Sequence, residues 1–349
     1  CSHRGRPARS EAIARVLIHW AFNTTARDAR SMTEDERQAY RWAESHTPNV
    51  TALNEPALLR AVLDGVAIKL DGTPRSPSVV MRWRKTFNTA LEYAVERRLL
   101  TANPLKGIKW SATRTVRIID RRTVANPTQA RTIFNSLRDF ENGQRLLAFF
   151  GCLYFAAMRS EEAAALRNEN LDIPRTGWGL IHLERARPFA GRAWTNTGES
   201  RDERPLKHRE NGETRPVPCP PELTRLLQEH IERYGVAADG RLFVGSRTRE
   251  HLPTRTVTLA WARARGAALT PEAASSPLAR TPYDLRHAAV STWLAAGVPA
   301  TQVAEWARHS VEVLFKIYAK CLDGEETRTR ARVMAALGGP VTDVRQRSQ

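Results

Sequence analysis

The sequence predicts a mainly α-helical protein of two domains, in which a helical first domain precedes a mixed α+β domain with a small antiparallel sheet. Three observations support this fold class. The chain has 349 residues, enough for about two domains of ordinary size. Apolar residues recur at helical spacing over most of the chain. Short strand-like segments are confined to the middle, where Asn211-Gly212 is the preferred two-residue hairpin turn.

The first domain is expected to comprise residues 1–107 and to be helical. Its N-terminal part includes EAIARVLIHWAF, in which the apolar residues have helical spacing. Asn103-Pro104 and Gly107 are typical of the end of a helical region. The stretch 108–126 is basic and has only weak structural signals, so we interpret it as a linker.

The second domain is expected to span residues 127–338, with a disordered tail at 339–349. TQARTIFNSLRDF predicts its first helix, and RLLAFFGCLYFAAM predicts another after a break at Asn142-Gly143. GWGLIHLE predicts a short strand, and RPLKHRE and ETRPVP predict two strands that pair with each other across the hairpin turn. From Pro220 onward the pattern is again mostly helical.

The chain is strongly basic. It has 54 Lys and Arg residues against 37 Asp and Glu residues, a formal net charge of +17. This excess favours a polyanionic partner, for which nucleic acid is the leading candidate; a basic surface without a specific partner is the alternative. No apolar run approaches the ~18 residues of a membrane span, and no signal peptide is recognisable.

The segment MRWRKTFNTALEYAVERRLL is predicted to be an amphipathic helix of the first domain. Its apolar face is formed by Trp83, Phe87, Leu91 and Val95. The opposite face carries Arg82, Arg84 and Lys85. We expect these three cations to contact nucleic-acid phosphates, with a merely solvated helix face as the alternative.

The cysteines do not form a metal-binding or redox motif. They are Cys1, Cys152, Cys219 and Cys321, and no two of them are spaced as CxxC. This pattern indicates small core or surface residues in a reducing compartment rather than a zinc site.

Because the chain begins with Cys1 rather than Met, we expect an N-terminal part of the protein to be missing.

Five side chains have types that suit one reaction: Arg159, Lys207, Arg286, His309 and Tyr318. The reaction is cleavage of a phosphodiester by a protein nucleophile. Attack adds negative charge to the non-bridging oxygens, which guanidinium groups and an imidazole stabilise. The phenol must lose its proton from a reference pKa of about 10, and the leaving 5′ oxygen needs a proton that a lysine can donate. This chemistry needs no metal and no other cofactor, so we expect none.

The order and spacing of these residues resemble the catalytic domain of the tyrosine recombinases, the phage-type integrases. Arg159 is followed three residues later by Glu162. Asp284, Leu285, Arg286 and His287 match the D-L-R-H motif, with Tyr283 three residues before the arginine. His309 follows about two dozen residues later, and Tyr318 comes nine after it. The C-terminal run also resembles integrases of actinobacterial mobile elements, and the helical first half resembles, more weakly, the core-binding domain of these enzymes.

The chain departs from the pattern of the family at three places. Tyr283 stands where a histidine is usual; a phenol can donate a hydrogen bond to phosphate but does not become a cation near neutral pH. Arg308 replaces the glycine that commonly precedes the late histidine. Ala156-Ala157-Met158 replaces Thr-Gly-Leu, a change that we expect to be tolerated.

Each candidate residue also has a structural interpretation. Arg159 and Glu162 would form a buried ion pair, in which Glu162 could also orient the arginine. Lys207 would be a surface lysine, although it is the only lysine between Lys109 and Lys316. Tyr318 would be a buried aromatic on a helix face.

The D-L-R-H segment is expected to begin a helix. Arg286 would lie in its first turn, capped by Asp284, where the helix N-terminus itself favours a phosphate. The adjacent His287 is interpreted as structural.

The resemblance implies a site-specific recombinase that attacks double-stranded DNA attachment sites with Tyr318, through a 3′-phosphotyrosyl intermediate. It implies catalytic roles for Arg159, Lys207, Tyr283, Arg286, His309 and Tyr318, and a homotetramer on DNA that integrates or excises a mobile element. The setting would be the bacterial cytoplasm and nucleoid, with no membrane. Whether an accessory directionality factor takes part stays open.

Two other functions stay open at this point. A type IB topoisomerase uses similar groups to relax supercoiled DNA. A regulator without catalytic activity is the second alternative, because WLAAGVPATQVAEWARHS resembles a helix-turn-helix in which Arg308 and His309 would contact bases. The second alternative leaves Arg159, Lys207 and Tyr318 without a role.

Overall fold

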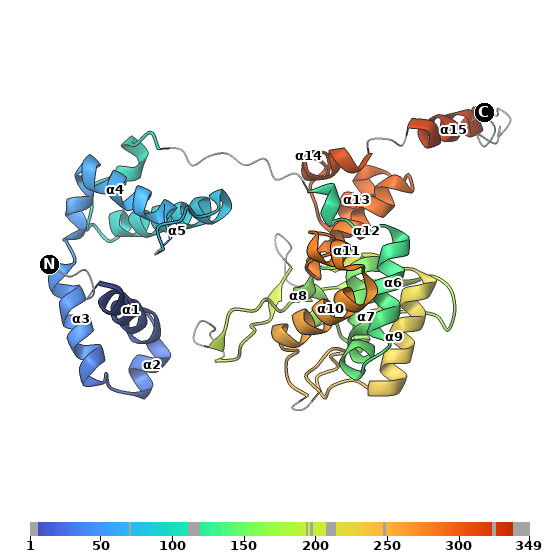
Figure 1. Cartoon of the computed structure of the whole chain (residues 1–349), viewed down its shortest axis with the longest axis horizontal. Helices are drawn as coiled ribbons and strands as arrows, with labels where there is room; N and C mark the ends of the chain where they lie inside the picture. The colour runs from blue at the N-terminus through green and yellow to red at the C-terminus, as the bar shows by residue number, and fades with distance from the viewer. Residues whose placement is uncertain are drawn as a thin grey trace. The chain divides into compact units, whose positions relative to one another are not determined.

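The chain forms two compact units, Cys1–Val116 and Arg117–Gln349, which are described separately (Figure 1). The computed structural model describes residues 6–69, 71–110, 119–192, 195, 198–206, 214–246, 249–322 and 326–337. The cysteine Cys1, the predicted turn Asn211-Gly212, the candidate Lys207 and the predicted tail lie outside these ranges. No helix within them is long and apolar enough to cross a membrane.

Among its described residues, the helices and strands of the first unit are all helices, as predicted. Its elements are α1 (Arg6–Val16), the π-helix η2 (Leu17–Ala21), α2 (Thr24–Ala29), α3 (Glu34–His46), the 3-10 helix η3 (Val50–Asn54), α4 (Pro56–Ala67), α5 (Pro77–Glu96) and the 3-10 helix η4 (Pro104–Gly107). Residues at the N-termini of several of these helices favour helix initiation. Thr33 and Glu36 form a capping box at α3, and Pro occupies the first turn of α4 and of α5.

The core of the first unit lies between α4 and α5. Its buried residues are Leu59, Leu63, Leu91, Ala94, Leu100 and Leu105, with Phe87 and Val95 packed against them. The prediction that Trp83 belongs to this apolar face is wrong. Trp83 is 45% exposed, and the Arg75 guanidinium lies 4.3 Å above its ring, so a cation rather than the core covers the indole.

The second unit is mainly helical with a small antiparallel sheet, which confirms the predicted fold class. Its helices are η5 (Arg121–Thr123), α6 (Pro127–Leu137), α7 (Glu141–Phe155), α8 (Ser160–Ala165), η6 (Asn168–Asn170), α9 (Pro221–Tyr234), α10 (Thr254–Ala268), α11 (Pro271–Ser275), α12 (Tyr283–Ala295), α13 (Ala300–Ala307), α14 (Val311–Leu322) and α15 (Glu326–Ala336). Its strands are β1 (Leu171–Asp172), β2 (Gly179–Leu183), β3 (Arg185–Ala186), β4 (Arg204–Pro205) and β5 (Arg215–Cys219).

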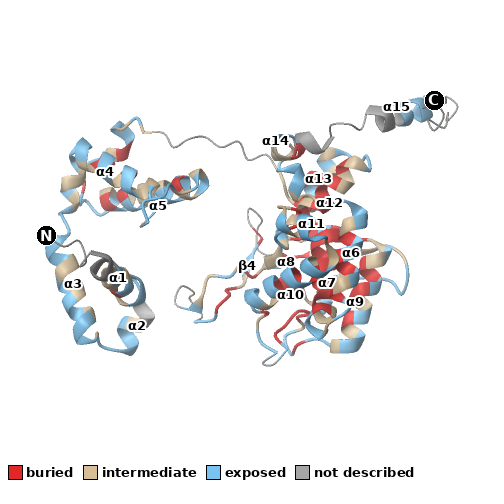
Figure 2. Cartoon of the chain, viewed as in Figure 1, coloured by how far each residue is buried: buried red, intermediate tan, exposed pale blue. Residues whose placement is uncertain are grey.

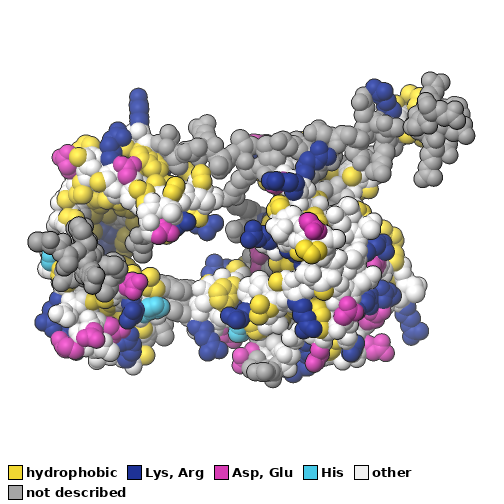
Figure 3. Space-filling view, in the orientation of Figure 1, with side chains coloured by type: hydrophobic (Ala, Val, Ile, Leu, Met, Phe, Trp, Pro, Cys, Tyr) yellow, Lys and Arg dark blue, Asp and Glu magenta, His cyan; other side chains and the backbone are white. Residues whose placement is uncertain are grey.

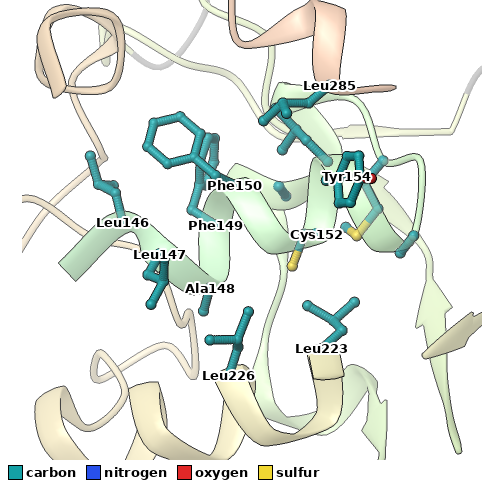
Figure 4. Packing of buried hydrophobic residues seen from close by; sticks show 14 of the residues in the cluster. Leu146, Leu147, Ala148, Phe149, Phe150, Cys152, Tyr154, Leu223, Leu226 and Leu285 are labelled. Carbon is teal, nitrogen blue, oxygen red and sulfur yellow. The ribbon is translucent and has the colours of Figure 1, made fainter. Parts of the chain in front are cut away.

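Helix α7 is the centre of the second unit. Residues from Leu146 to Tyr154 are buried along the whole of its circumference, and side chains of α9 and α12 pack around them (Figure 4). Burial is correspondingly denser around α7 than anywhere in the first unit (Figure 2). The predicted break at Asn142-Gly143 is wrong, because α7 begins at Glu141 and runs through both residues. A side chain at Gly143 would collide with the Leu137 carbonyl oxygen, so the glycine serves close packing.

The sheet differs from the predicted hairpin. The predicted strand in GWGLIHLE is present as β2, and β5 pairs with it from Gly179↔Cys219 to Leu183↔Arg215. β4 pairs with β3 instead, so the two segments predicted to pair with each other belong to different sheets. The longer β2–β5 pairing buries Ile181, Val217 and Cys219 against the main core, which explains the preference. The two prolines of β5 are tolerated because β5 is an edge strand.

A second, smaller apolar cluster joins α12, α13 and α14. Its members are Ala157, Ala289, Val290, Leu294, Val303, Ala304, Ala307, Leu314 and Tyr318. The chain that enters the second unit also reaches it, since the Ile119 N–H donates to the Ile317 carbonyl at 3.3 Å. This cluster includes Tyr318, the candidate nucleophile.

Candidate active site

Arg159 lies at the N-cap of α8, directly after α7 has ended. Its Nη1 donates to Glu162 Oε1 at 2.9 Å, and its backbone N–H donates to Glu162 Oε2 at 2.8 Å. The Glu162 side chain is 2% exposed and that of Arg159 is 27% exposed. The buried carboxylate therefore orients a guanidinium group that still reaches solvent.

Arg215 on β5 binds the same carboxylate. Its Nη2 donates to Glu162 Oε2 at 2.8 Å, and its side chain is 1% exposed. Burial by itself raises the pKa of Glu162, but the charges of Arg215, Arg286 and Arg159 outweigh burial and hold this pKa at about 2. Arg215 was not among the predicted site residues. The available signal was an arginine in register with Val217 on the inward face of a predicted strand.

Arg286 is completely buried on α12. Its Nη1 donates to the carbonyl oxygen of Ala157, and its Nη2 donates to that of Ala307. Burial lowers the pKa of Arg286, and the positive charge of Arg159 lowers it further. Arg286 thus ties the turn before α8 to the end of α13.

Both of these turns contain a non-glycine residue in the left-handed conformation. Ala157 has φ of 46° and Arg308 has φ of 53°. These are two of the positions where the sequence departs from the glycine usual in the resembled family. The left-handed region costs an ordinary residue about 1 kcal/mol or more, and the surrounding hydrogen bonds hold both turns in place. One of them is donated by Arg159 Nη2 to the Arg308 carbonyl at 3.2 Å.

His309 follows this turn and lies beside Tyr318. The two ring centroids are 5.9 Å apart. Burial, together with the charges of Arg286 and Arg159, lowers the pKa of His309 to about 3, so its ring is neutral near pH 7. Its Nε2 is buried and has no hydrogen-bond partner among the residues described.

Tyr318 on α14 is completely buried, in the cluster of α12, α13 and α14. Its hydroxyl lies 2.9 Å from Nδ1 of His287. His287 was expected to be structural, yet it contacts the candidate nucleophile directly.

Tyr283 lies at the start of α12 and is 39% exposed. The edge of its ring meets the ring of His287 at a centroid distance of 5.0 Å. The prediction that Asp284 caps the helix is wrong, because α12 begins at Tyr283 and Asp284 lies within its first turn. The Asp284 carboxylate instead accepts hydrogen bonds from the Thr281 N–H at 2.7 Å and from its hydroxyl at 3.0 Å.

A cavity of about 470 Å³ adjoins the arginines. It is lined by Arg159, Glu161, Glu162, Ala186, Pro188, Arg204, Pro205, Leu206 and Arg308. The candidate Lys207 comes directly after Leu206 in the sequence, so the chain leaves the described region at the wall of this cavity.

The three predicted phosphate contacts on α5 differ in their surroundings. Arg82 and Lys85 are exposed. Arg84 is half-buried, with its guanidinium 5.7 Å from the centroid of the Trp110 ring, so it packs against its own unit. More generally, Lys and Arg side chains are scattered among Asp and Glu over the face shown in Figure 3, on both units.

The site has an excess of positive charge. Arg159, Arg215 and Arg286 lie around one carboxylate, Glu162, which bonds directly to two of them. Three buried donor atoms of the site have no hydrogen-bond partner in the described part of the chain: Nε of Arg286, and Nε and Nη1 of Arg215. Buried donors and uncompensated cations favour an anion, and guanidinium groups match the paired oxygens of a phosphate.

Comparison with known proteins places this geometry in a known fold. Neither a known sequence family nor a curated protein matches the chain. The Tn1549 transposon integrase, in a complex with circular intermediate DNA, matches with a TM-score of 0.57 and 15% identity, over 93% of this chain and 99% of that one. The site-specific recombinase XerH, bound to its difH substrate in a pre-cleavage complex, matches with a TM-score of 0.52 and 14% identity, over 85% of this chain and 76% of that one.

These structures agree with the resemblance that the ordered residues suggested, and they extend it beyond the motifs to most of the chain. The protein therefore has the fold of the tyrosine-type integrases and recombinases.

Proposed function

We propose that the protein is a site-specific DNA recombinase with Tyr318 as its nucleophile. One observation carries the proposal: hydrogen bonds and one ring contact join the candidate residues of four separate segments. Arg286 bonds to the backbone at Ala157 and Ala307, and Arg159 bonds to the backbone at Arg308. The residue after Arg308 is His309, whose ring lies beside Tyr318.

The proposed reaction begins with attack of Tyr318 Oη on a DNA phosphorus. An Oη–P bond forms and the bond to the 5′ oxygen breaks, which leaves a 3′-phosphotyrosyl link and a 5′ hydroxyl. Arg159 and Arg286 stabilise the charge that develops on the non-bridging oxygens, and the neutral His309 donates a hydrogen bond to one of them. Lys207 donates the proton to the leaving oxygen, and Tyr283 lies at the exposed edge of the same site.

Rejoining is the reverse step. A 5′ hydroxyl from a partner strand attacks phosphorus and releases the phenol. The ester energy stays in the phosphotyrosyl bond, so each exchange needs no external energy source. Exchange between two duplexes requires four cleavages, which a tetramer on paired attachment sites supplies. Integration and excision of a mobile element is the biological role that such exchange would serve.

The first unit would contribute DNA binding rather than chemistry. Arg82 and Lys85 are exposed on α5, together with Thr86, Thr89 and Tyr93, and the acidic residues of the helix, Glu92 and Glu96, lie near its C-terminal end. Such a face can contact phosphates and present hydrogen-bonding groups to a groove of DNA.

The experiment that tests the proposal looks for a covalent adduct. The protein is incubated with nicked duplexes that carry candidate attachment sites, so that the released short strand diffuses away and traps the intermediate. Denaturing electrophoresis should show a protein–DNA adduct for the wild type and none for Tyr318→Phe, while a mobility shift shows that both bind DNA. Tyr234→Phe is the matched control, because it removes a phenol of the same unit whose hydroxyl has no partner among the described residues.

A plasmid relaxation assay beside the adduct assay separates the alternative functions. A type IB topoisomerase would relax supercoiled plasmid without an attachment site, whereas the proposed enzyme would require the site. A helix-turn-helix regulator would bind DNA and never become attached. The geometry does not favour the regulator, because Nε2 of His309 is buried and Arg308 belongs to the wall of the cavity.

A further inference from the structure

His287 makes a direct polar contact to the candidate nucleophile. Its Nδ1 lies 2.9 Å from Tyr318 Oη, which is an ordinary hydrogen-bond distance. The two residues come from neighbouring helices, α12 and α14, and their ring centroids are 5.8 Å apart. By contrast, the ring of His309 lies at a similar distance of 5.9 Å, yet Nε2 of His309 has no hydrogen-bond partner within the described ranges.

The reaction requires a proton acceptor at this atom. A phenol attacks phosphorus efficiently only if its proton leaves as the new bond forms. The cationic groups of the site cannot accept a proton, because guanidinium groups have no lone pair available for it. A neutral imidazole within hydrogen-bond distance of the phenol can.

The surroundings keep His287 neutral. Its ring contacts Tyr318 on α14 and Tyr283 on its own helix. The charge of Arg286 acts on it, and it interacts electrostatically with His309. Burial lowers the pKa of His287 to about 4, and the charge of Arg286 adds to this effect. A phosphate bound at the arginines would offset the charge of Arg286, so the basicity of His287 would rise when substrate is present.

We propose that His287 is the general base for Tyr318. In the cleavage step the Oη–H bond breaks and its proton passes to Nδ1 of His287, while the Oη–P bond forms. The P–O5′ bond breaks, and the 5′ oxygen takes a proton from the general acid, for which Lys207 is the candidate. In rejoining, His287 returns the proton to the departing phenolate. This inference rests on the proposed function and requires the tautomer of His287 that carries its hydrogen on Nε2.

A different role would produce opposite results. If the hydrogen bond only held Tyr318 in its buried position, loss of His287 would free the tyrosine and leave cleavage unchanged or faster. If the hydrogen bond only oriented the phenol, any side chain that preserves it would suffice. The two variants His287→Ala and His287→Asn distinguish these roles, because the amide of asparagine can occupy the position of Nδ1 without accepting a proton.

The test measures the single-turnover rate of adduct formation on the nicked substrate, with the full chain and saturating protein. Both variants should be slower than the wild type by about 100-fold or more, which is the usual contribution of a general base. Added imidazole should partly restore His287→Ala and should not affect His287→Asn. The wild type and Tyr318→Phe, measured together, test the nucleophile of the proposed function: an adduct with the wild type and none with Tyr318→Phe identifies Tyr318 as the nucleophile whatever the His287 variants do.

A sulfur leaving group then separates the base from the acid. In a substrate whose scissile 5′ oxygen is replaced by sulfur, the leaving thiolate needs no proton. Lys207→Ala should recover on this substrate, and both His287 variants should stay slow. The proposal is overturned if His287→Asn cleaves within about threefold of the wild type, if His287→Ala cleaves faster, or if the sulfur substrate restores either variant. DNA binding by mobility shift and thermal melting confirm that each variant is folded.

Discussion

Glu162 provides the sharpest test of the electrostatics of the site, and Glu162→Gln is the perturbation. The substitution keeps the size of the side chain and its ability to accept a hydrogen bond, but it removes the negative charge that three buried or half-buried arginines share. The fold should lose stability because these cations then lie together without a counter-charge.

The magnitude follows from the pKa of Glu162. The folded protein lowers this pKa from its ordinary value of 4.5 to about 2. At about 1.4 kcal/mol per pH unit, this difference corresponds to roughly 3 kcal/mol of free energy of unfolding at neutral pH. Breaking one side of a buried ion pair costs a similar amount, about 3–5 kcal/mol.

The pH dependence has a definite sign. A carboxyl group whose pKa is lower in the folded state stabilises the protein fully above the ordinary value of 4.5, and this contribution is lost as the pH falls toward 2. The wild type should therefore lose about 3 kcal/mol over that interval through Glu162, whereas Glu162→Gln cannot lose it. The difference between the two proteins should be largest near pH 7 and should vanish near pH 2.

The assay is urea unfolding of the full chain at several pH values, with the transition of the second unit fitted separately. Glu161→Gln is the control, because it removes the neighbouring carboxylate of the same helix turn and should change the free energy of unfolding by less than about 1 kcal/mol. Equal stability of Glu162→Gln and the wild type at pH 7, or a difference that persists unchanged at the acid end, would refute the reasoning.

Three further substitutions test other parts of the structure. Arg215→Met should slow adduct formation by at least about tenfold. Without the hydrogen bond from Arg215, the Glu162 carboxylate is held less firmly and orients Arg159 less well. An unchanged rate with normal folding would show that Arg215 is only structural. In urea unfolding, Ala157→Gly should destabilise the protein by about 1 kcal/mol less than Ala163→Gly. Both substitutions remove a buried methyl group, but only Ala157→Gly also removes the strain of a left-handed backbone conformation. Equal losses of stability would contradict this. Arg82→Ala should weaken DNA binding and reduce by about 1 the slope of the logarithm of the binding constant against the logarithm of the salt concentration. Arg84→Ala should mainly destabilise the first unit, because Arg84 packs against Trp110. The reverse pattern would contradict this assignment of the two arginines.

Much of the candidate site could be predicted because its residues have local signatures. Arg159 and Glu162 are three positions apart at the start of a helix, so their contact depends on helix geometry alone. The nine positions from His309 to Tyr318 span a turn and part of one helix, which brings the two rings together. The periodicity of the helices in both units was equally visible, and it was enough for the fold class.

Other features could not be predicted because they depend on neighbours that the helical pattern of a segment does not include. Trp83 has the spacing of a core residue, yet Arg75 covers it in place of the core. Gly143 belongs to a pair typical of a break, yet α7 needs the glycine to pass close to Leu137. In both cases a neighbour outside the local pattern decided the outcome.

The sequence by itself determined the fold class, the order of the candidate catalytic residues and the excess of basic groups, since these depend on composition and on spacing within single helices. Only the tertiary structure decided that Arg215 reaches Glu162 from a strand 53 positions away, and that His287 meets the hydroxyl of Tyr318 across two helices. The physical reason is that such contacts are set by how helices and strands pack, and a one-dimensional pattern does not encode the partner of a side chain that faces inward.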